Sequence, residues 1–168
     1  MHLSLGSIDI PRDKVIKLLG INIDQKLDFD YHISNICKRA SFHVKAIQRL
    51  ARYLDTEGLL RLFHAFIRSN FQYANIVWHF TSNSNVLKME KNQRKSLRIV
   101  LSDYKSSYKD LLKKANTTSL YVSRIKAIAI ETFKCIKKLN PKFLHDIFKT
   151  NDSGFDLRDG MILITPKV

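Results

Sequence analysis

Eight basic side chains fall into two groups whose spacing suits the binding of phosphates. Successive residues of an α-helix are rotated by about 100° around its axis. On such a helix the side chains of the first group all lie within about 60° of one another. Its members are Lys38, Lys45, Arg49 and Arg52. The second group is spaced by three, four and three residues and consists of Lys88, Lys91, Lys95 and Arg98. Because Lys and Arg neutralise phosphates without reading bases, the two stripes predict a nucleic-acid backbone as partner, bound independently of sequence.

The charge of the whole chain favours the same class of partner. There are 29 Lys and Arg against 15 Asp and Glu, a formal net charge of +14. Residues 31–102 hold twelve basic and three acidic side chains, so the middle of the chain carries much of the excess. A balance this basic suits nucleic acid, an anionic membrane surface or an acidic protein. Basic faces that serve only solubility are the alternative.

The residue types that catalysis needs do not occur in a usable pattern. There is no GxSxG motif, and the five glycines form no phosphate-cradling loop. Metal-dependent nucleotidyl transfer needs at least two carboxylates that hold the ions. Asp24, Asp28 and Asp30 flank a turn and a helix start, where capping explains them better. Cys37 and Cys135 form no CxxC pair, so we expect reduced thiols. Because the residues form no catalytic or metal-binding pattern, we also expect no metal, no cofactor and no enzyme activity.

The elements that must position these side chains begin with strands. Residues 3–10 place two apolar pairs on either side of Gly6-Ser7, a pattern that predicts a tight hairpin. Val15–Ile23 is short, mostly apolar and β-branched, and predicts a single strand. A hairpin plus one strand is marginal alone, so we expect it to pack on something else.

After Asp28 the apolar period lengthens to the value of a helix, with Asp28 or Asp30 available as a cap. A continuous apolar stripe lies opposite the first basic group. It comprises Ile33, Ile36, Ala40, Val44, Ile47, Ala51 and Leu54. The segment therefore predicts one helix with a core face and a basic face.

A second helix is predicted to restart at Asp55–Glu57 and to run from Leu59 to Phe80. It is apolar nearly all round, which predicts burial on most sides. Its aromatic cluster suits base stacking, although helical spacing favours the core; the cluster is Phe71, Tyr73, Trp78 and Phe80. Arg61 and Arg68 are seven residues apart and are predicted to share an exposed edge.

Further helices are predicted over residues 86–101, which carry the second basic stripe, over 107–115 and over 121–139. Ser107–Asp110 resembles a capping box, and Pro141 is suited to begin a last short helix through Phe148. Residues 161–164 read as a strand, and no apolar stretch reaches the length of a membrane span. The expected fold is mainly α: an antiparallel helical bundle preceded by a small N-terminal β-hairpin or strand element.

Four segments, in order, resemble the carboxy-terminal region of reverse transcriptases from non-LTR retrotransposons of the LINE type, including jockey-like elements. These segments are Val15–Ile33, Ala65–Trp78, Arg94–Val100 and Phe155–Val168. In that family the strand containing Leu-Gly belongs to the primer grip, and the helices that follow form a thumb that holds the template–primer duplex. The resemblance thus implies a primer-grip-like role for Leu18, Leu19 and Gly20.

The resemblance also implies a division of the chain. Residues 1–28 are expected to be the end of the palm, 29–149 a thumb-like helical domain, and 150–168 a truncated tail. The aspartates that bind Mg²⁺ are expected upstream of residue 1. We therefore expect a fragment of an RNA-directed DNA polymerase that keeps the thumb and lacks the catalytic palm.

Two other interpretations stay open: a free-standing basic helical adaptor for an acidic protein, and a non-functional transposon relic. Met1–Leu5 lacks the basic start and long apolar run of a signal peptide. We expect an intracellular protein, nuclear or cytoplasmic and not secreted, whose partner is template–primer nucleic acid rather than a membrane. The sequence leaves the oligomeric state and the choice between RNA and DNA open.

Overall fold

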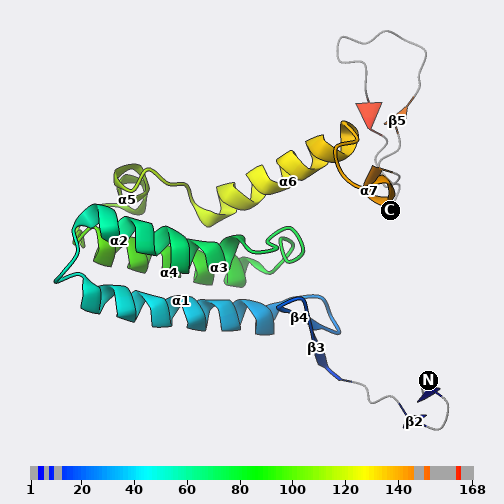
Figure 1. Cartoon of the computed structure of the whole chain (residues 1–168), viewed down its shortest axis with the longest axis horizontal. Coiled ribbons are helices and arrows are strands. Elements are labelled where there is room, and N and C mark those ends of the chain that lie inside the picture. The colour runs from blue at the N-terminus through cyan, green and yellow to red at the C-terminus, as the bar shows by residue number, and fades with distance from the viewer. Residues whose placement is uncertain (1–3, 6–7, 10–12, 146–149, 152–161, 164–168) are drawn as a thin grey trace. The chain divides into compact units, whose positions relative to one another are not determined.

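The fold is mainly helical with a small β-hairpin near the N-terminus, as the sequence predicts (Figure 1). The computed structural model describes residues 4–5, 8–9, 13–145, 150–151 and 162–163. Its contacts divide the chain into two units, Met1–Arg124 and Ile125–Val168. Both basic stripes belong to the first unit. The domain boundaries expected after residues 28 and 149 remain predictions.

Two short antiparallel hairpins precede the helices. β1 (Ser4–Leu5) pairs with β2 (Ile8–Asp9), which confirms the first predicted hairpin. Its predicted turn and outer residues lie outside the described residues. β3 (Val15–Leu18) pairs with β4 (Ile21–Asp24) in a register that places Leu18 opposite Ile21.

The prediction of one strand over Val15–Ile23 is therefore wrong, because the segment folds back on itself at Leu19-Gly20. Both residues have positive φ, 46° for Leu19 and 85° for Gly20, as a two-residue type I′ turn requires. Glycine adopts this conformation freely, whereas it costs a residue such as leucine about 1–3 kcal/mol. Leucine replaces the usual Asn or Asp, so the apolar run conceals the turn.

α1 (Asp30–Leu50) begins after a tight turn that Asp24 organises. The Asp24 carboxylate accepts backbone N–H bonds from Lys26 at 3.1 Å, Asp28 at 3.2 Å and Phe29 at 2.8 Å. The predicted caps act otherwise: Asp28 accepts from the N–H of Asp30 at 3.0 Å, and no side chain caps the helix from its first flanking position. The carboxylates thus shape the turn into the helix.

The apolar stripe of α1 is buried from Ile33 to Ile47. Ala51 is half-buried at the end of the stripe, just beyond the helix. Leu54 lies after the last helical turn and is 40% exposed, so its predicted place in the stripe is wrong.

The second predicted helix is a rod of three consecutive pieces. These are α2 (Thr56–Leu62), the π-helical segment η1 (Phe63–Arg68) and α3 (Ser69–Gln72). Asp55 caps it by accepting from the N–H of Gly58 at 2.9 Å. In the π-helical part the N–H of Ser69 bonds five residues back, to His64. The side chains of Ser69 and Asn70 bond to the carbonyls of Ala65 and Phe66 in turn.

The rod ends at Gln72, not at Phe80 as predicted, and residues 73–80 form successive turns. Only part of the aromatic cluster belongs to the core. Phe71 and Trp78 are buried, whereas Tyr73 is 57% and Phe80 is 89% exposed. The long apolar run reads as one helix because its aromatic residues continue past the point where the backbone turns.

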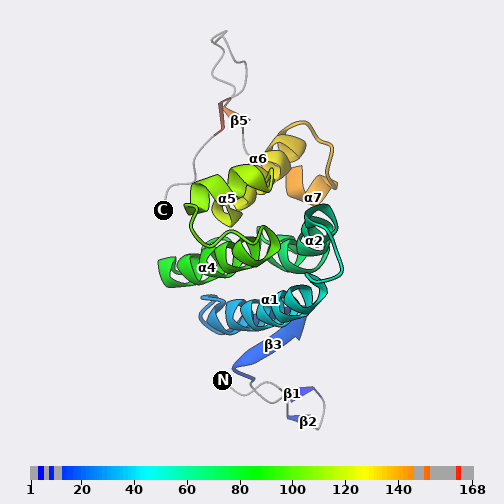
Figure 2. The same cartoon turned by 90° about the vertical axis from the view of Figure 1, so that its left-hand side faces the viewer.

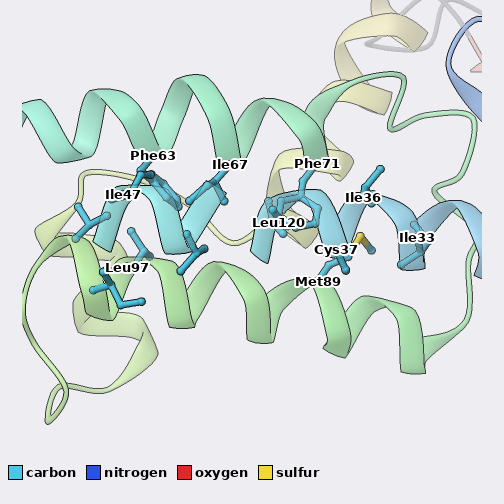
Figure 3. Close-up of a cluster of buried hydrophobic side chains, with 14 of the residues drawn as sticks. Ile33, Ile36, Cys37, Ile47, Phe63, Ile67, Phe71, Met89, Leu97 and Leu120 are labelled. Atoms are coloured by element: carbon cyan, nitrogen blue, oxygen red, sulfur yellow. The ribbon is translucent and has the colours of Figure 1, made fainter. Parts of the chain in front are cut away.

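The core of the first unit lies between α1, the α2–α3 rod and α4 (Asn83–Val100), with the rod antiparallel to both helices (Figures 1 and 2). Figure 3 shows Phe63 and Phe71 of the rod pointing toward Met89 and Leu97 of α4. Burying such side chains stabilises the fold by about 1.5–3 kcal/mol each. Ser82 caps α4 by accepting from the N–H of Asn85 at 3.3 Å.

Ser107 caps α5 (Tyr108–Lys114) as predicted, since it accepts from the N–H of Asp110 at 3.3 Å. The Asp110 carboxylate accepts from the Ser107 hydroxyl at 2.6 Å, in place of the backbone N–H bond of a full capping box. α6 (Leu120–Ile136) crosses the division between the units and ends three residues before the predicted Leu139. The second unit also holds α7 (Lys142–His145) and a pairing of β5 (Thr150–Asn151) with β6 (Ile162–Leu163). The rest of the predicted last helix and strand lies outside the described residues.

Candidate nucleic-acid interface

α1 and α4 lie side by side and run in the same direction, which three side-chain hydrogen bonds demonstrate. Asn85 donates to Asp30 at 2.5 Å, Lys88 donates to Ser34 at 2.9 Å, and Ser41 donates to Asn92 at 2.9 Å. The partners advance together along both helices, as only a parallel pair allows. Members of both basic stripes therefore flank one seam.

A groove of about 520 Å³ follows the first part of this seam. Its basic side chains come from both helices: Lys38 and Lys45 from α1 and Lys88 from α4. The remaining lining residues are Ser34, Cys37, Ser41, Phe42 and Asn92. Lys38 and Lys45 are exposed and have no ion-pair partner within the described residues. The structure thus brings together members of both predicted stripes.

A second hollow of about 510 Å³ lies farther along α4 and collects three more of the predicted residues, Lys91, Lys95 and Arg98. Gln48 of α1 lines it too, together with Ile99 and Tyr104. Arg94 also lines this hollow, although the predicted stripe omits it. Arg94 is three residues from Lys91, and this helical spacing could have predicted that it lies on the same face.

Arg49 and Arg52 line neither hollow, although both are exposed. Arg49 lies in the last turn of α1, where its positive charge interacts favourably with the negative end of the helix dipole. Arg52 lies beyond the helix, so the helical projection that groups it with Lys38 and Lys45 does not apply to it. Of the first stripe, the structure therefore places two members in the groove.

The only acidic residue of α4 is held away from the seam. Glu90 accepts a hydrogen bond from the Tyr108 hydroxyl and another from the backbone N–H of Tyr121 at 2.8 Å. Burial raises the pKa of the Tyr108 hydroxyl, and its bond to Glu90 raises it further. The groove between α1 and α4 is consequently lined by basic and neutral side chains alone.

Cys37 lines the groove as a buried thiol. Burial raises its pKa to about 11, although the nearby Lys88 and Asn92 act in the opposite direction. The sulfur is therefore protonated at neutral pH, and a neutral thiol is a poor nucleophile. The groove offers phosphate-neutralising ammonium groups and an exposed aromatic ring, and no reactive group.

Leu18, Leu19 and Gly20, for which the sequence predicts a primer-grip-like role, form the tip of the β3–β4 hairpin. Leu18 is 56% and Leu19 is 81% exposed. The Tyr73 hydroxyl donates to the Leu19 carbonyl at 2.7 Å and holds the strained turn against the end of the rod. Behind Gly20 lies a cavity of about 290 Å³ that Arg39, His32, Asn70 and Tyr73 help to line.

The Mg²⁺ that the resembled family uses does not fit the carboxylates of this region. Both oxygens of Asp24 accept backbone N–H bonds. Burial alone would raise the pKa of Asp24, but the N–H groups of Asp28, Phe29 and Lys26 outweigh it and lower the pKa. Asp28 and Asp30 also accept bonds, from a backbone N–H and from Asn85. No group of three or more His, Cys, Asp and Glu in the described residues is placed to hold a metal ion.

Sequence reasoning misplaces Arg68, which it assigns to an exposed edge with Arg61. Arg68 is 9% exposed, and its guanidinium donates to Thr118 and Ser123. Arg61 is exposed and pairs with Glu57 at 2.6 Å. The turns of the π-helical segment are wider than those of an α-helix, so the seven-residue spacing no longer keeps the two side chains on one edge.

Comparisons of the chain with known protein families, with curated proteins and with solved structures found no match. Within the residues that the structure describes, no helix is long and apolar enough to cross a bilayer.

Proposed function

We propose that the seam between α1 and α4 binds the backbone of nucleic acid independently of sequence. One observation carries the proposal: Lys38, Lys45 and Lys88 converge from two helices on one groove, and no carboxylate lines it. Ammonium groups arranged in this way bind phosphates and release counterions. Cations that serve only solubility have no need to converge.

The resemblance to LINE-type reverse transcriptases supports a more specific form of the proposal. The chain would be the palm-end and thumb portion of such an enzyme, intracellular in the nucleus or cytoplasm, and would hold the template–primer without catalysing its extension. The β3–β4 hairpin tip at Leu18–Gly20 would be the primer-grip-like element. The adjacency of α1 and α4 is compatible with this form, because side chains of both helices can contact one strand.

An adaptor for an acidic protein is the second candidate, favoured by the same basic groove. A nuclease-protection footprint separates the two, since only a nucleic-acid-binding chain shields a stretch of backbone. A non-functional relic is the third. The packed core around Phe63, Phe71 and Leu97 supports a chain that folds, and a cooperative thermal melt would argue against the relic.

The test is a titration with an RNA–DNA hybrid over a range of salt concentrations. Six of the predicted side chains line the two hollows. If between half and all of them contact phosphates, log affinity should fall with log salt with a slope of about −3 to −5. Replacing Lys38 and Lys45 with Ala should make the slope shallower by about 2 and lower the affinity.

Lys109 and Lys113 supply the matched control. They are exposed on α5, line neither hollow and are four residues apart, so their double Ala variant removes the same charge from a helix. Ala preserves helical structure in both variants. If both double variants lose the same affinity, the binding is due to the general surface charge and not to the seam. If the unmodified chain binds neither the hybrid nor a single strand at low salt, the proposal itself is refuted.

A further inference from the structure

Phe42 is an exposed aromatic ring inside the basic groove. It lines the groove beside Lys38 and Lys45, and it is 71% exposed. Residues 38, 42 and 45 are separated by four and three positions, so they lie along one face of α1. The ring therefore stands between two ammonium groups on the same helical face.

Packing against the core does not account for this ring. The buried stripe of α1 uses Ile33, Ile36, Ala40, Val44 and Ile47, and Phe42 belongs to the opposite side. Its nearest aromatic neighbour is His43, with ring centroids 5.8 Å apart in an edge-to-face arrangement. His43 in turn lies 5.6 Å from the half-exposed ring of Phe66. With 71% of Phe42 exposed, its ring remains accessible to another flat group.

We infer that the groove takes single-stranded nucleic acid, with one base stacked on Phe42 and the flanking phosphates held by Lys38 and Lys45. The inference deepens the proposed function and rests on it. In a duplex the faces of the bases are already stacked on one another, so Phe42 has nothing to bind there. An unpaired base offers a free π-face, and stacking on an aromatic ring tolerates any base.

The dimensions agree with this occupant. Seven residues of α-helix separate Lys38 from Lys45, about 10 Å along the axis. The two ammonium groups therefore lie on either side of Phe42 along the helix, where the two phosphates that flank one stacked base would be. The volume of about 520 Å³ lies in the range of sites that hold a small planar ligand.

The experiment compares Phe42→Ala with the unmodified chain on four probes: single-stranded RNA and DNA of mixed sequence, an RNA–DNA hybrid and duplex DNA. Loss of one stacking contact should weaken binding of both single strands by about fivefold to 150-fold. Binding of both duplexes should change by less than about twofold, since base faces are absent there. Phe42→Tyr keeps the ring and should restore single-strand affinity. Far-UV circular dichroism verifies that the exposed-site variants fold.

Phe42→Trp supplies an independent readout. The chain has one tryptophan, Trp78, which is fully buried, so the new indole is the exposed fluorophore. A base stacked on it should quench its emission when a single strand is added. Tyr53→Trp is the matched control, because Tyr53 is 80% exposed and lines neither hollow, and its emission should stay unchanged.

The outcomes separate the two proposals. Equal losses on single strands and duplexes in Phe42→Ala, or no quenching in Phe42→Trp, would overturn the stacking inference while leaving backbone binding intact. If the unmodified chain binds no probe at low salt, the proposed function fails and the inference fails with it.

Discussion

Two buried arginines of the first unit should respond to the same substitution with opposite signs. Arg68 and Arg124 are 9% and 1% exposed. Arg68 donates to the carbonyl and the hydroxyl of Thr118, both at 3.1 Å, and to Ser123 at 2.6 Å. Arg124 has only the weak acceptor sulfur of Met89 at 3.8 Å, and its Nε and Nη2 have no hydrogen-bond partner among the described residues.

The expected magnitudes follow from these contacts. Each unpartnered buried donor of Arg124 costs about 1–3 kcal/mol, so the two together cost roughly 2–6 kcal/mol. The guanidinium lies 5.7 Å from the ring of Trp78 and 5.9 Å from that of Tyr121. These two cation–π contacts together stabilise the fold by about 1–4 kcal/mol. Arg124→Met, which fills similar space without polar atoms, should therefore stabilise the fold by about 1–2 kcal/mol.

Arg68→Met should destabilise the fold by about 2–4 kcal/mol, because three bonds to a charged group are lost together. The orphaned acceptors limit the loss: Gln93 still donates to the Thr118 carbonyl at 2.9 Å, and the hydroxyls of Thr118 and Ser123 lie 3.1 Å apart. Burial lowers the pKa of both arginines, so desolvation opposes the charge in each; only Arg68 has the bonds that compensate.

Urea unfolding followed by circular dichroism measures both effects. For a slope of about 2 kcal/mol per molar urea, Arg124→Met should raise the midpoint by roughly 0.5–1 M. Arg68→Met should lower it by roughly 1–2 M on the same scale. An unchanged slope would show that the shifts reflect stability rather than a change in the unfolded chain. A lower midpoint for Arg124→Met would refute the claim that its unpartnered donors outweigh its ring contacts.

Two other predictions concern the carboxylates. The pKa of Asp24 is lower in the folded chain than its ordinary value of 3.8. The carboxylate therefore stabilises the fold fully when the pH is above 3.8, and this stabilisation is lost as the pH falls through the lower pKa of the folded state. Asp24→Asn should therefore weaken hydrogen-exchange protection of β3–β4 at neutral pH, and the difference from the unmodified chain should shrink in acid; a constant difference down to pH about 2 would contradict this. Primer extension with Mg²⁺ or Mn²⁺ should be undetectable for this chain. Extension that a single aspartate substitution abolishes would contradict this, because it would show that the chain holds a catalytic metal ion.

Helical periodicity is sufficient to predict the parts of the fold whose apolar stripe is regular. α1 shows this, because Ile33 through Ile47 recur on one face and are buried. Local side-chain chemistry also predicts well: Ser107 and Asp110 form the expected cap of α5. Both signals fail where apolar residues continue through a change of backbone direction, at Leu19 within the β-hairpin and after Gln72 at the end of the rod. There a positive φ, at Leu19 and at Ala74, marks a turn that the hydrophobic pattern does not encode.

Part of the candidate site could also be predicted from the sequence, and part could not. Lys38, Lys45 and Lys88 could be selected by spacing, since each lies on the polar side of an amphipathic helix. Their convergence could not, because it depends on α1 and α4 running parallel at a particular offset. The roles of Arg68 and Arg124 depend on acceptors such as Thr118 and Ser123 that are distant in sequence. The seven-residue spacing from Arg61 predicts an exposed position for Arg68, which is also the commoner fate of arginine.

The positive groove results from how the fold distributes a small number of acids. Glu90 is two residues from Lys88 and therefore about 200° away around α4. Bonds from Tyr108 and Tyr121 hold its carboxylate on that side, near the buried arginines whose charge it partly offsets. The same contacts tie α5 and the start of α6 to α4. The acidic residue of α4 thus lies on the side away from the groove and holds the helices together there, and Lys38, Lys45 and Lys88 remain available to a polyanion.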